Sequence, residues 1–263
     1  MAARRVGHRS YHHPRALAGT NRRSSAEYHA PAGGCGRGSL ATGGTMTDDD
    51  PVGVPFEAAH WDLVPGGTVL VVIDPQNDFL HPDGWYAQKG IDIAHMRRVI
   101  EPTRQLLKDA RAKNIPVVWT RHGSRGVEDG GPFMRLRPFL KDGGLRQNTW
   151  GYEIFEELKP REDDWYVDKT RLSAFYNSNL EGVLRALHAD TVLIAGVLTN
   201  QCVAATSKDA MFRDFKPIVI EDCTGTTLPH LHDPAIEMMR VGWCEVRDLE
   251  STLGEIRQLS AVR

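Results

Sequence analysis

Short apolar runs that alternate with helical segments constrain the fold of this chain more than any other feature. Thr68-Val-Leu-Val-Val-Ile73 is a continuous run of mostly β-branched residues, which is typical of a strand buried on both faces. Similar runs predict further strands at residues 115–120, 164–168, 191–196, 217–220 and 244–246. Helical spacing predicts helices at residues 92–113, 152–158, 180–187, 204–215, 232–241 and 249–259. The Gly-rich and charged residues 121–150 predict a long loop.

Repeated β-α-β units of this size predict an α/β fold in which one six-stranded, mostly parallel sheet lies between two layers of helices. No internal repeat and no linker divides residues 56–263, so we expect a single domain there. In sheets of this kind, ligands bind at the carboxyl ends of the strands. Polar residues that directly follow a predicted strand are therefore the first candidates for a functional site.

The composition argues against several classes of function. The 263 residues carry a formal net charge of -2, without the basic excess of a nucleic-acid-binding protein. No apolar run is long enough to span a bilayer, so we expect no membrane partner. The four cysteines, at positions 35, 202, 223 and 244, form no C-x-x-C pair, which argues against a zinc ribbon or a redox motif. They predict reduced thiols and a cytoplasmic location.

The first 45 residues differ from the rest in composition. They hold seven arginines, no lysine and one acid, Glu27, and they are rich in Gly, Ala, Ser and His. This composition predicts disorder, and it is also typical of an organelle transit peptide. Met46, followed by Thr-Asp-Asp-Asp, offers a third interpretation, in which translation starts there and residues 1–45 are upstream sequence. We favour the third interpretation and treat residues 1–55 as an extension outside the folded domain.

Three residues with complementary chemistry follow three of the predicted strands. Asp74 comes directly after the first strand, Lys169 follows the strand at 164–168, and Cys202 lies between the strand at 191–196 and the next helix. Each alone has an ordinary structural interpretation, as a turn aspartate, a solvated lysine or a buried thiol. Together at one edge of a sheet they supply the groups that covalent amide hydrolysis needs.

The mechanism predicted from these residues uses all three. Cys202 attacks an amide carbonyl carbon, and its place on the first turn of a helix favours the reactive thiolate. Asp74 takes the thiol proton and returns it to the departing nitrogen, while Lys169 holds the carboxylate in place and favours the thiolate. Backbone N–H groups at the head of the helix bind the oxyanion, and water activated by the same carboxylate releases the acyl group.

Four stretches resemble the isochorismatase-like cysteine hydrolase superfamily, and the similarity spans about residues 60–260. They are Val72-Ile-Asp74-Pro-Gln-Asn-Asp-Phe79, Val167-Asp-Lys169, Ser173-Ala-Phe175 and Gly196-Val-Leu-Thr-Asn-Gln-Cys202-Val. The resemblance implies a Rossmann-like fold of three α-β-α layers, a homo-oligomer, and a catalytic triad of Asp74, Lys169 and Cys202. It also implies a non-proline cis peptide between Val197 and Leu198, with Leu198 and Cys202 at the oxyanion hole.

The sequence after the strand at 115–120 separates branches of this family. Nicotinamidases carry an Asp-x-His metal motif there, whereas this chain has Arg121-His122-Gly-Ser-Arg125, and one histidine is insufficient for a metal site. We therefore predict no metal, and no G-x-G-x-x-G follows the first strand to bind a dinucleotide cofactor. Three segments most resemble the ureidoacrylate and biuret amidohydrolases, which act on carbamoyl compounds: Asp83-Gly-Trp-Tyr-Ala87, Gly90-Ile-Asp92 and Asn148-Thr-Trp-Gly-Tyr-Glu-Ile154.

The sequence thus predicts an amidohydrolase that cleaves a C–N bond of a small amide or ureide through a thioester on Cys202. Two alternatives stay open: an isochorismatase-type ether hydrolase, and a catalytically silent oligomeric binding protein of the same fold. The candidates for substrate binding are Gln76, Asn77, His122, Trp150, Arg171, Phe175 and Tyr176. Arg171 either binds a substrate carboxylate or forms a surface salt bridge, and the aromatic residues either line the pocket or pack in the core.

Overall fold

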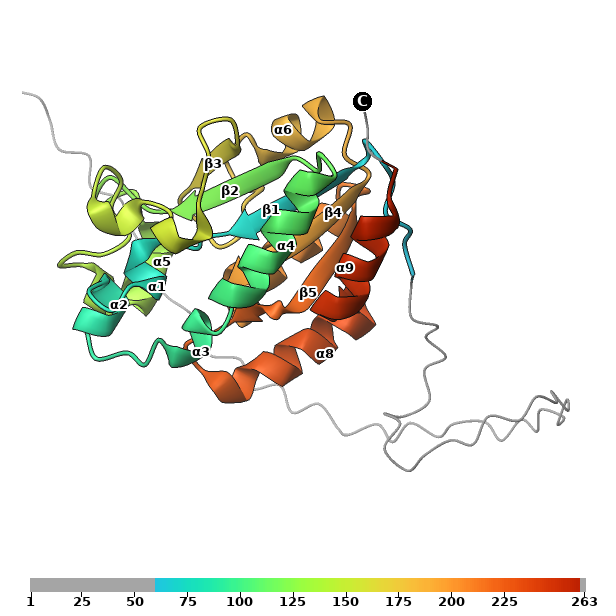
Figure 1. The fold of residues 1–263 in the computed structure, drawn as a ribbon. Helices are drawn as coiled ribbons and strands as arrows, with labels where there is room; N and C mark the ends of the chain where they lie inside the picture. Colours follow the sequence, from blue (N-terminus) through green and yellow to red (C-terminus); the bar gives the residue numbers. More distant parts are fainter. Residues whose placement is uncertain (1–59, 261–263) are drawn as a thin grey trace, which may run out of the picture. The chain divides into compact units, whose positions relative to one another are not determined.

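The computed structural model describes residues 60–260, which form an α/β fold around one six-stranded parallel sheet (Figure 1). The strand order is β3-β2-β1-β4-β5-β6, and every neighbouring pair is parallel. The strands are β1 Thr68–Ile73, β2 Val117–His122, β3 Trp165–Lys169, β4 Thr191–Val197, β5 Lys216–Gly225 and β6 Glu245–Arg247. The predicted fold class is confirmed. The predicted extension of residues 1–55 lies outside the described residues.

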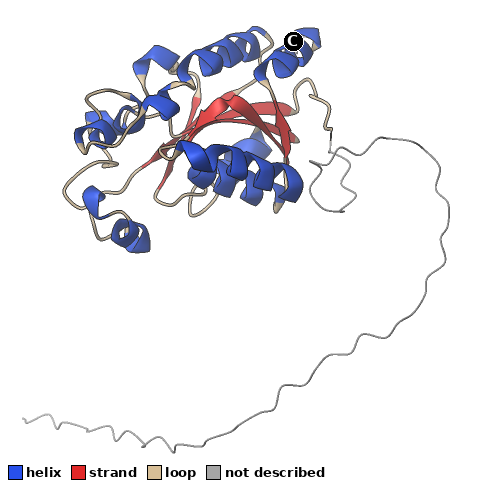
Figure 2. Cartoon of the chain, turned by 90° about the horizontal axis from the view of Figure 1, so that it is seen from below, coloured by secondary structure: helices blue, strands red, loops and turns tan. Residues whose placement is uncertain are grey.

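Helices lie on both faces of the sheet, as Figure 2 shows. The longer ones are α4 Ile100–Ala112, α6 Leu180–Ala186, α7 Ala204–Met211, α8 His232–Gly242 and α9 Leu249–Gln258. The short ones are α1 Asn77–Leu80, α2 Trp85–Gln88, α3 Ala94–Arg97, α5 Gly131–Leu136, η1 Pro138–Leu140, η2 Trp150–Tyr152, η3 Glu156–Leu158, η4 Thr199–Val203 and η5 Pro229–Leu231. Of the helices in the described part of the chain, none has the length and apolar character that crossing a membrane requires.

The side chains of β1 alternate between two apolar cores. Leu70 and Val72 pack with side chains of α4 and α9 on one face of the sheet. Val69, Val71 and Ile73 pack with side chains of α6, α7 and α8 on the other face. Every residue of β1 is buried because helices cover both faces, which is why the strand reads as a continuous apolar run.

Two of the predicted helices differ in the structure. The helix predicted at residues 92–113 is two helices, α3 and α4, and Pro102 gives the reason: it has no N–H to bond the carbonyl of Arg98. Residues 152–158 hold no α-helix, only the single turns η2 and η3, because Ile154 pairs with Gln76 in an isolated bridge. The loop predicted at residues 121–150 contains the short helices α5 and η1, each with a proline in its first turn.

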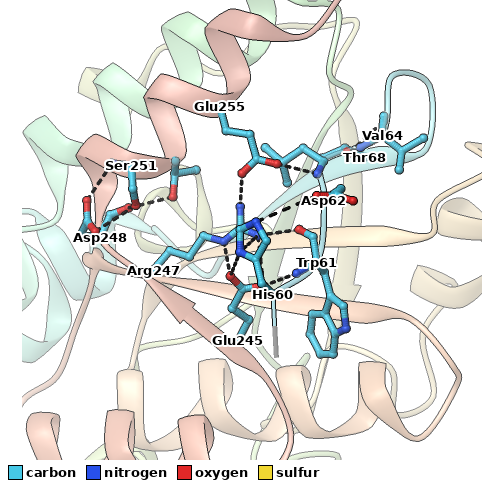
Figure 3. A network of polar contacts seen from close by, with 12 residues as sticks. His60, Trp61, Asp62, Val64, Thr68, Glu245, Arg247, Asp248, Ser251 and Glu255 are labelled. Atoms are coloured by element: carbon cyan, nitrogen blue, oxygen red, sulfur yellow. Dashed lines mark hydrogen bonds and ion pairs between the residues drawn. The ribbon is translucent and has the colours of Figure 1, made fainter. Parts of the chain in front are cut away.

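Arg247 ties the edge strand β6 to the chain segment that precedes β1 (Figure 3). Its guanidinium pairs with the carboxylates of Glu245 and Glu255 and donates to the backbone carbonyl of Trp61. The ring of His60 lies 3.1 Å from the same Glu245 carboxylate. A cavity of about 500 Å³ opens beside this cluster at the edge of the sheet. The polar residues that follow the predicted strands lie elsewhere, around β1 and β4 in the middle of the sheet.

Candidate active site

The carboxyl ends of four strands meet around β1. The chain runs from β1 outward through β2 to β3 and then returns to the other side of β1 as β4. Parallel sheets bind ligands at such a switch of direction, because the loops on either side diverge there. Asp74 follows β1, His122 and Lys169 are the last residues of β2 and β3, and Cys202 lies in the turn η4 after β4. The topology therefore brings the three predicted catalytic residues to one place.

Asp74 and Lys169 form a fully buried ion pair. The Lys169 Nζ lies 2.7 Å from Asp74 Oδ2, and both side chains are 0% exposed. The same ammonium donates to the backbone carbonyl oxygens of Arg171 and Leu172, each at 3.0 Å. Burial lowers the pKa of Lys169, but the charges of Asp74 and Cys202 and the hydrogen bonds to them together raise it by more, so this pKa lies above its usual value. Lys169 is therefore a permanent cation in this site.

Thr120, which sequence reasoning missed, fixes the other carboxylate oxygen. Its hydroxyl donates to Asp74 Oδ1 at 2.6 Å and accepts the backbone N–H of Asp74 at 3.1 Å. Asp74 has a φ of 48°, a costly conformation for a residue with a side chain, and it persists only where the surroundings fix it. The register of β1 and β2 would have pointed to Thr120. Val72 pairs with Trp119, so the next residue of β2, Thr120, lies beside the end of β1, just before Asp74.

The Cys202 thiol lies buried beside this pair. Its Sγ, a carboxylate oxygen of Asp74 and a ring nitrogen of His122 all lie within 4.8 Å of one another. Burial and the charge of Asp74 raise the pKa of Cys202 to about 12, against the opposing charge of Lys169. A pKa this far above neutral favours the protonated thiol at neutral pH. The expected stabilisation of the thiolate is therefore not dominant here, because burial raises the pKa by more than the charge of Lys169 lowers it.

Gly196 and a cis peptide shape the turn that carries Cys202. The Val197–Leu198 peptide bond is cis, which confirms what the family resemblance implies. Gly196 has a φ of 115° and pairs with Ile73 of β1; a Cβ at this position would lie 2.1 Å from the Ile73 carbonyl oxygen, so only glycine fits. The Leu198 carbonyl then accepts two N–H groups of η4 at 3.0 and 3.2 Å, which closes the turn.

His122 faces the thiol as a neutral imidazole. Its Nδ1 lies 3.9 Å from Cys202 Sγ, and the residue is buried. Burial holds the pKa of His122 well below its usual value, and the charges of Lys169 and Arg171 lower it further. His122 therefore offers one hydrogen-bond donor and one acceptor but no charge.

Gln76 and Asn77, two predicted substrate-binding residues, brace the loops around the site. The Gln76 amide accepts the backbone N–H of His122 at 2.7 Å and donates to the carbonyls of His122 and Tyr152 at 3.1 and 2.9 Å. The Asn77 amide donates to the carbonyl of Trp150 at 2.8 Å. Both side chains are buried and hold backbone groups together, so the structure gives them a bracing role.

The other predicted substrate-binding residues are spread over different surroundings. Arg171 donates from its guanidinium to a loop carbonyl at 2.9 Å, and within residues 60–260 it forms no salt bridge. Phe175 is buried and its ring stacks on Phe215, with 6.0 Å between the ring centroids. Trp150 and Tyr176 are each 53% exposed. Tertiary packing sets these positions, and a role for these four residues in substrate binding stays a prediction.

A very small cavity lies on one side of His122. Its volume is about 10 Å³, which is roughly the space that one water molecule needs. Phe133 and Met134 of α5 and the nearby Leu145 contribute to its walls. These side chains, together with His122, separate this cavity from its surroundings on the side of β2.

Asp74, His122 and Cys202 also form a set of side chains that could in principle ligate a metal ion. The Lys169 ammonium lies 2.7 Å from the carboxylate, however, and would repel a second cation at that place. The arrangement favours proton transfer between thiol and carboxylate over metal binding, and the absence of a metal from the working enzyme stays a prediction.

The whole site lies within a region that matches known proteins. The isochorismatase domain model matches residues 68–251. The ureidoacrylate amidohydrolase RutB of Caulobacter segnis is 32% identical over 236 residues, which cover 82% of this chain and 95% of that protein. The RutB protein of Rhizobium rhizogenes is 35% identical over 187 residues, which cover 66% of this chain and 76% of that protein.

Two solved structures are also similar to this chain. A cysteine hydrolase from Pseudomonas syringae pv. phaseolicola has a TM-score of 0.71 and 27% identity, covering 77% of this chain and 98% of that one. The N-carbamoylsarcosine amidase from Thermoplasma acidophilum has a TM-score of 0.58 and 26% identity, covering 70% of this chain and 96% of that one. The chain therefore belongs to the isochorismatase family, and it is a hydrolase.

Proposed function

We propose that this hydrolase cleaves a C–N bond of a small carbamoyl compound of the ureide type, through a thioester on Cys202. The observation that carries the proposal is the fully buried pair of Asp74 and Lys169 beside a buried thiol. Support for the substrate class comes from the relatives, which are named for ureidoacrylate and N-carbamoylsarcosine.

The ion pair explains how a protonated thiol becomes a nucleophile. Transfer of the Cys202 proton to Asp74 leaves a thiolate and a neutral carboxyl group, and the site keeps the same net charge. Lys169 then pairs with the thiolate in place of the carboxylate; the negative charge of either anion raises the pKa of Lys169. Proton transfer at the moment of attack therefore avoids an unpaired buried charge, which would be costly at this depth.

The remaining steps follow from the same groups. The thiolate attacks the carbonyl carbon, and the negative charge passes to the carbonyl oxygen, where we propose that the backbone N–H groups of Leu198 and Cys202 bind it. The proton on Asp74 goes to the leaving nitrogen, the C–N bond breaks, and a thioester remains. Asp74 then takes a proton from water, which attacks the thioester, and the sulfur leaves to accept that proton.

His122 fits a carbamoyl group better than a carboxylate. Because its imidazole is neutral, it accepts an N–H of the carbamoyl NH2 without the attraction that a cation would give to an anionic substrate. The oxyanion donors would thus bind the carbonyl oxygen of the planar carbamoyl group, and His122 would accept a hydrogen bond from its NH2 group. We therefore propose that the carbamoyl group, rather than the rest of the substrate, binds next to Cys202.

The test is a substrate screen with a matched pair of cysteine variants. Ureidoacrylate, biuret, N-carbamoyl amino acids, nicotinamide and isochorismate are offered, and the release of ammonia and of pyruvate is followed. We expect ammonia from a carbamoyl substrate, a covalent adduct on Cys202 in the mass of acid-quenched protein, and no turnover by Cys202→Ala. The control is Cys223→Ala, a buried cysteine of β5 outside the site, which should retain activity.

Three outcomes would refute the proposal. Turnover of a carbamoyl substrate by Cys202→Ala excludes the covalent mechanism. Pyruvate from isochorismate, without ammonia from any amide, establishes the ether hydrolase instead. Binding of these compounds without conversion of any of them leaves a silent member of the fold.

A further inference from the structure

A second polar network contacts the turn that carries Cys202. His232, the first residue of α8, lies between Thr199 and Arg98: its Nδ1 is 3.0 Å from Thr199 Oγ1, and its Nε2 is 2.7 Å from Arg98 Nη2. Thr199 is the first residue of η4 and is fully buried. His232, Arg98 and Thr199 have no part in the mechanism given above, and the helix α8 packs against η4.

The chemistry of the partners fixes the proton on the His232 ring. A guanidinium group only donates hydrogen bonds, so the Nε2 facing Arg98 must accept. A neutral imidazole then carries its proton on Nδ1, which donates to the Thr199 hydroxyl. Burial and the charges of Arg98 and His95 lower the pKa of His232 to about 4, and the charge of Asp233 opposes them. The ring is therefore neutral at physiological pH, as this hydrogen-bond pattern requires.

The next residue of the turn is held as well. The Asn200 Oδ1 accepts the hydroxyl of Thr226 at 2.7 Å, and the backbone N–H of Thr226 donates to His95 Nδ1 at 3.1 Å. His95 and His232 lie edge to face, with 5.1 Å between their ring centroids. Two successive side chains of η4 are thus tied to groups that lie outside the turn, so the network constrains its orientation.

We infer that His232, with its tautomer set by Arg98, is a positioning residue that acts through Thr199 on the turn presenting Cys202. The inference rests on the proposed function, because the groups that it positions are the sulfur and the backbone N–H donors of that reaction. Its expected effect is on kcat rather than KM, since the network lies behind groups that act in the transition state.

Two substitutions at His232 separate its two hydrogen bonds. His232→Asn keeps a donor near the position of Nδ1 and loses the group that faces Arg98, whereas His232→Gln does the opposite. We expect His232→Gln and Thr199→Val each to lower kcat about tenfold and to leave KM unchanged. A tenfold change in rate is roughly what the loss of one buried hydrogen bond would cause. We expect His232→Asn to stay close to wild type, and the double variant of His232→Gln with Thr199→Val to be no worse than either single one. The control is His230→Gln, an exposed histidine nearby.

A spectroscopic readout tests the network without any substrate. In the two-bond 15N–1H spectrum of the histidine rings, we expect His232 to carry its proton on Nδ1, and Arg98→Met to shift protonation toward Nε2. If the wild-type protein hydrolyses no carbamoyl substrate, the proposed function fails, and the rate of Cys202 alkylation replaces kcat as the readout for the same variants. A wild-type His232 protonated on Nε2, or His232→Gln with the kcat or alkylation rate of wild type, would overturn the inference.

Discussion

Replacement of Lys169 by methionine tests the buried ion pair on which the proposed mechanism depends. Lys169→Met keeps the length of the side chain but leaves the Asp74 carboxylate buried without its partner, and it removes the donor to two backbone carbonyls. Breaking a buried pair from one side typically costs about 3–5 kcal/mol. We therefore expect the free energy of unfolding to fall by about that amount, and the melting temperature to fall on the order of 10 °C.

The chain offers a matched control for this substitution. Lys216 and Asp190 form an ion pair of nearly the same length, 2.8 Å between Nζ and Oδ2, but their side chains are 44% and 47% exposed. Because water screens such a pair, Lys216→Met should cost only about 0–1 kcal/mol. Both variants are compared by urea denaturation at one protein concentration, since assembly would otherwise shift the midpoints.

A second variant separates stability from activity. Asp74→Asn combined with Lys169→Met removes both charges while the amide oxygen can still accept from Thr120, so we expect much of the lost stability to return. Activity should not return, because the base that takes the thiol proton is gone. Equal destabilisation by Lys169→Met and Lys216→Met, or a double variant less stable than Lys169→Met, would refute the reasoning from burial.

Three further predictions address other parts of the site. Thr120→Val removes the 2.6 Å hydrogen bond to Asp74, and because a hydrogen bond to a charged group contributes about 1.5–3 kcal/mol, steady-state kinetics should show kcat lowered about tenfold to a hundredfold; an unchanged kcat would mean that Asp74 is held by other contacts. Because burial raises the pKa of Cys202 to about 12, the thiolate fraction should still rise with pH above neutrality. The rate of Cys202 alkylation by iodoacetamide, measured from the mass of its peptide, should therefore increase about tenfold per pH unit from about pH 7 to about pH 10. A rate that levels off below about pH 8 would contradict this prediction. Gly196→Ala should lower the free energy of unfolding by about 1–3 kcal/mol, because its Cβ would meet a backbone carbonyl oxygen at 2.1 Å, whereas Gly182→Ala on the exposed side of α6 should raise it by about 0.5–1 kcal/mol; denaturation curves with equal shifts for both would show that the close strand contact is absent.

Sequence reasoning succeeded where the signal is local. The strand at 68–73 was predicted with the bounds that the structure has, because an apolar β-branched run bounded by a turn needs no tertiary information. It failed at residues 152–158, where pairing of Ile154 with Gln76 replaces the predicted helix. It also missed the division at Pro102, although the missing N–H of a proline is a local signal.

The candidate site divides in the same way. Asp74, Lys169 and Cys202 were found from their places at strand ends, because parallel strands bring their carboxyl ends to one edge of a sheet. Thr120 and His232 were missed, since each acquires its importance from a partner distant in the sequence, Asp74 in one case and Thr199 in the other. Phe175 was expected near the substrate from its motif, and the structure places its ring against Phe215.

The sequence by itself determined the order of strands and helices, the residue types of the candidate site and the family, because these depend on local patterns and short motifs. Only the tertiary structure decided that burial raises the pKa of Cys202, that burial lowers the pKa of His122 and that Lys169 pairs with Asp74. The physical reason is that pKa values depend on burial and on charges a few ångströms away, and both arise when distant segments pack together.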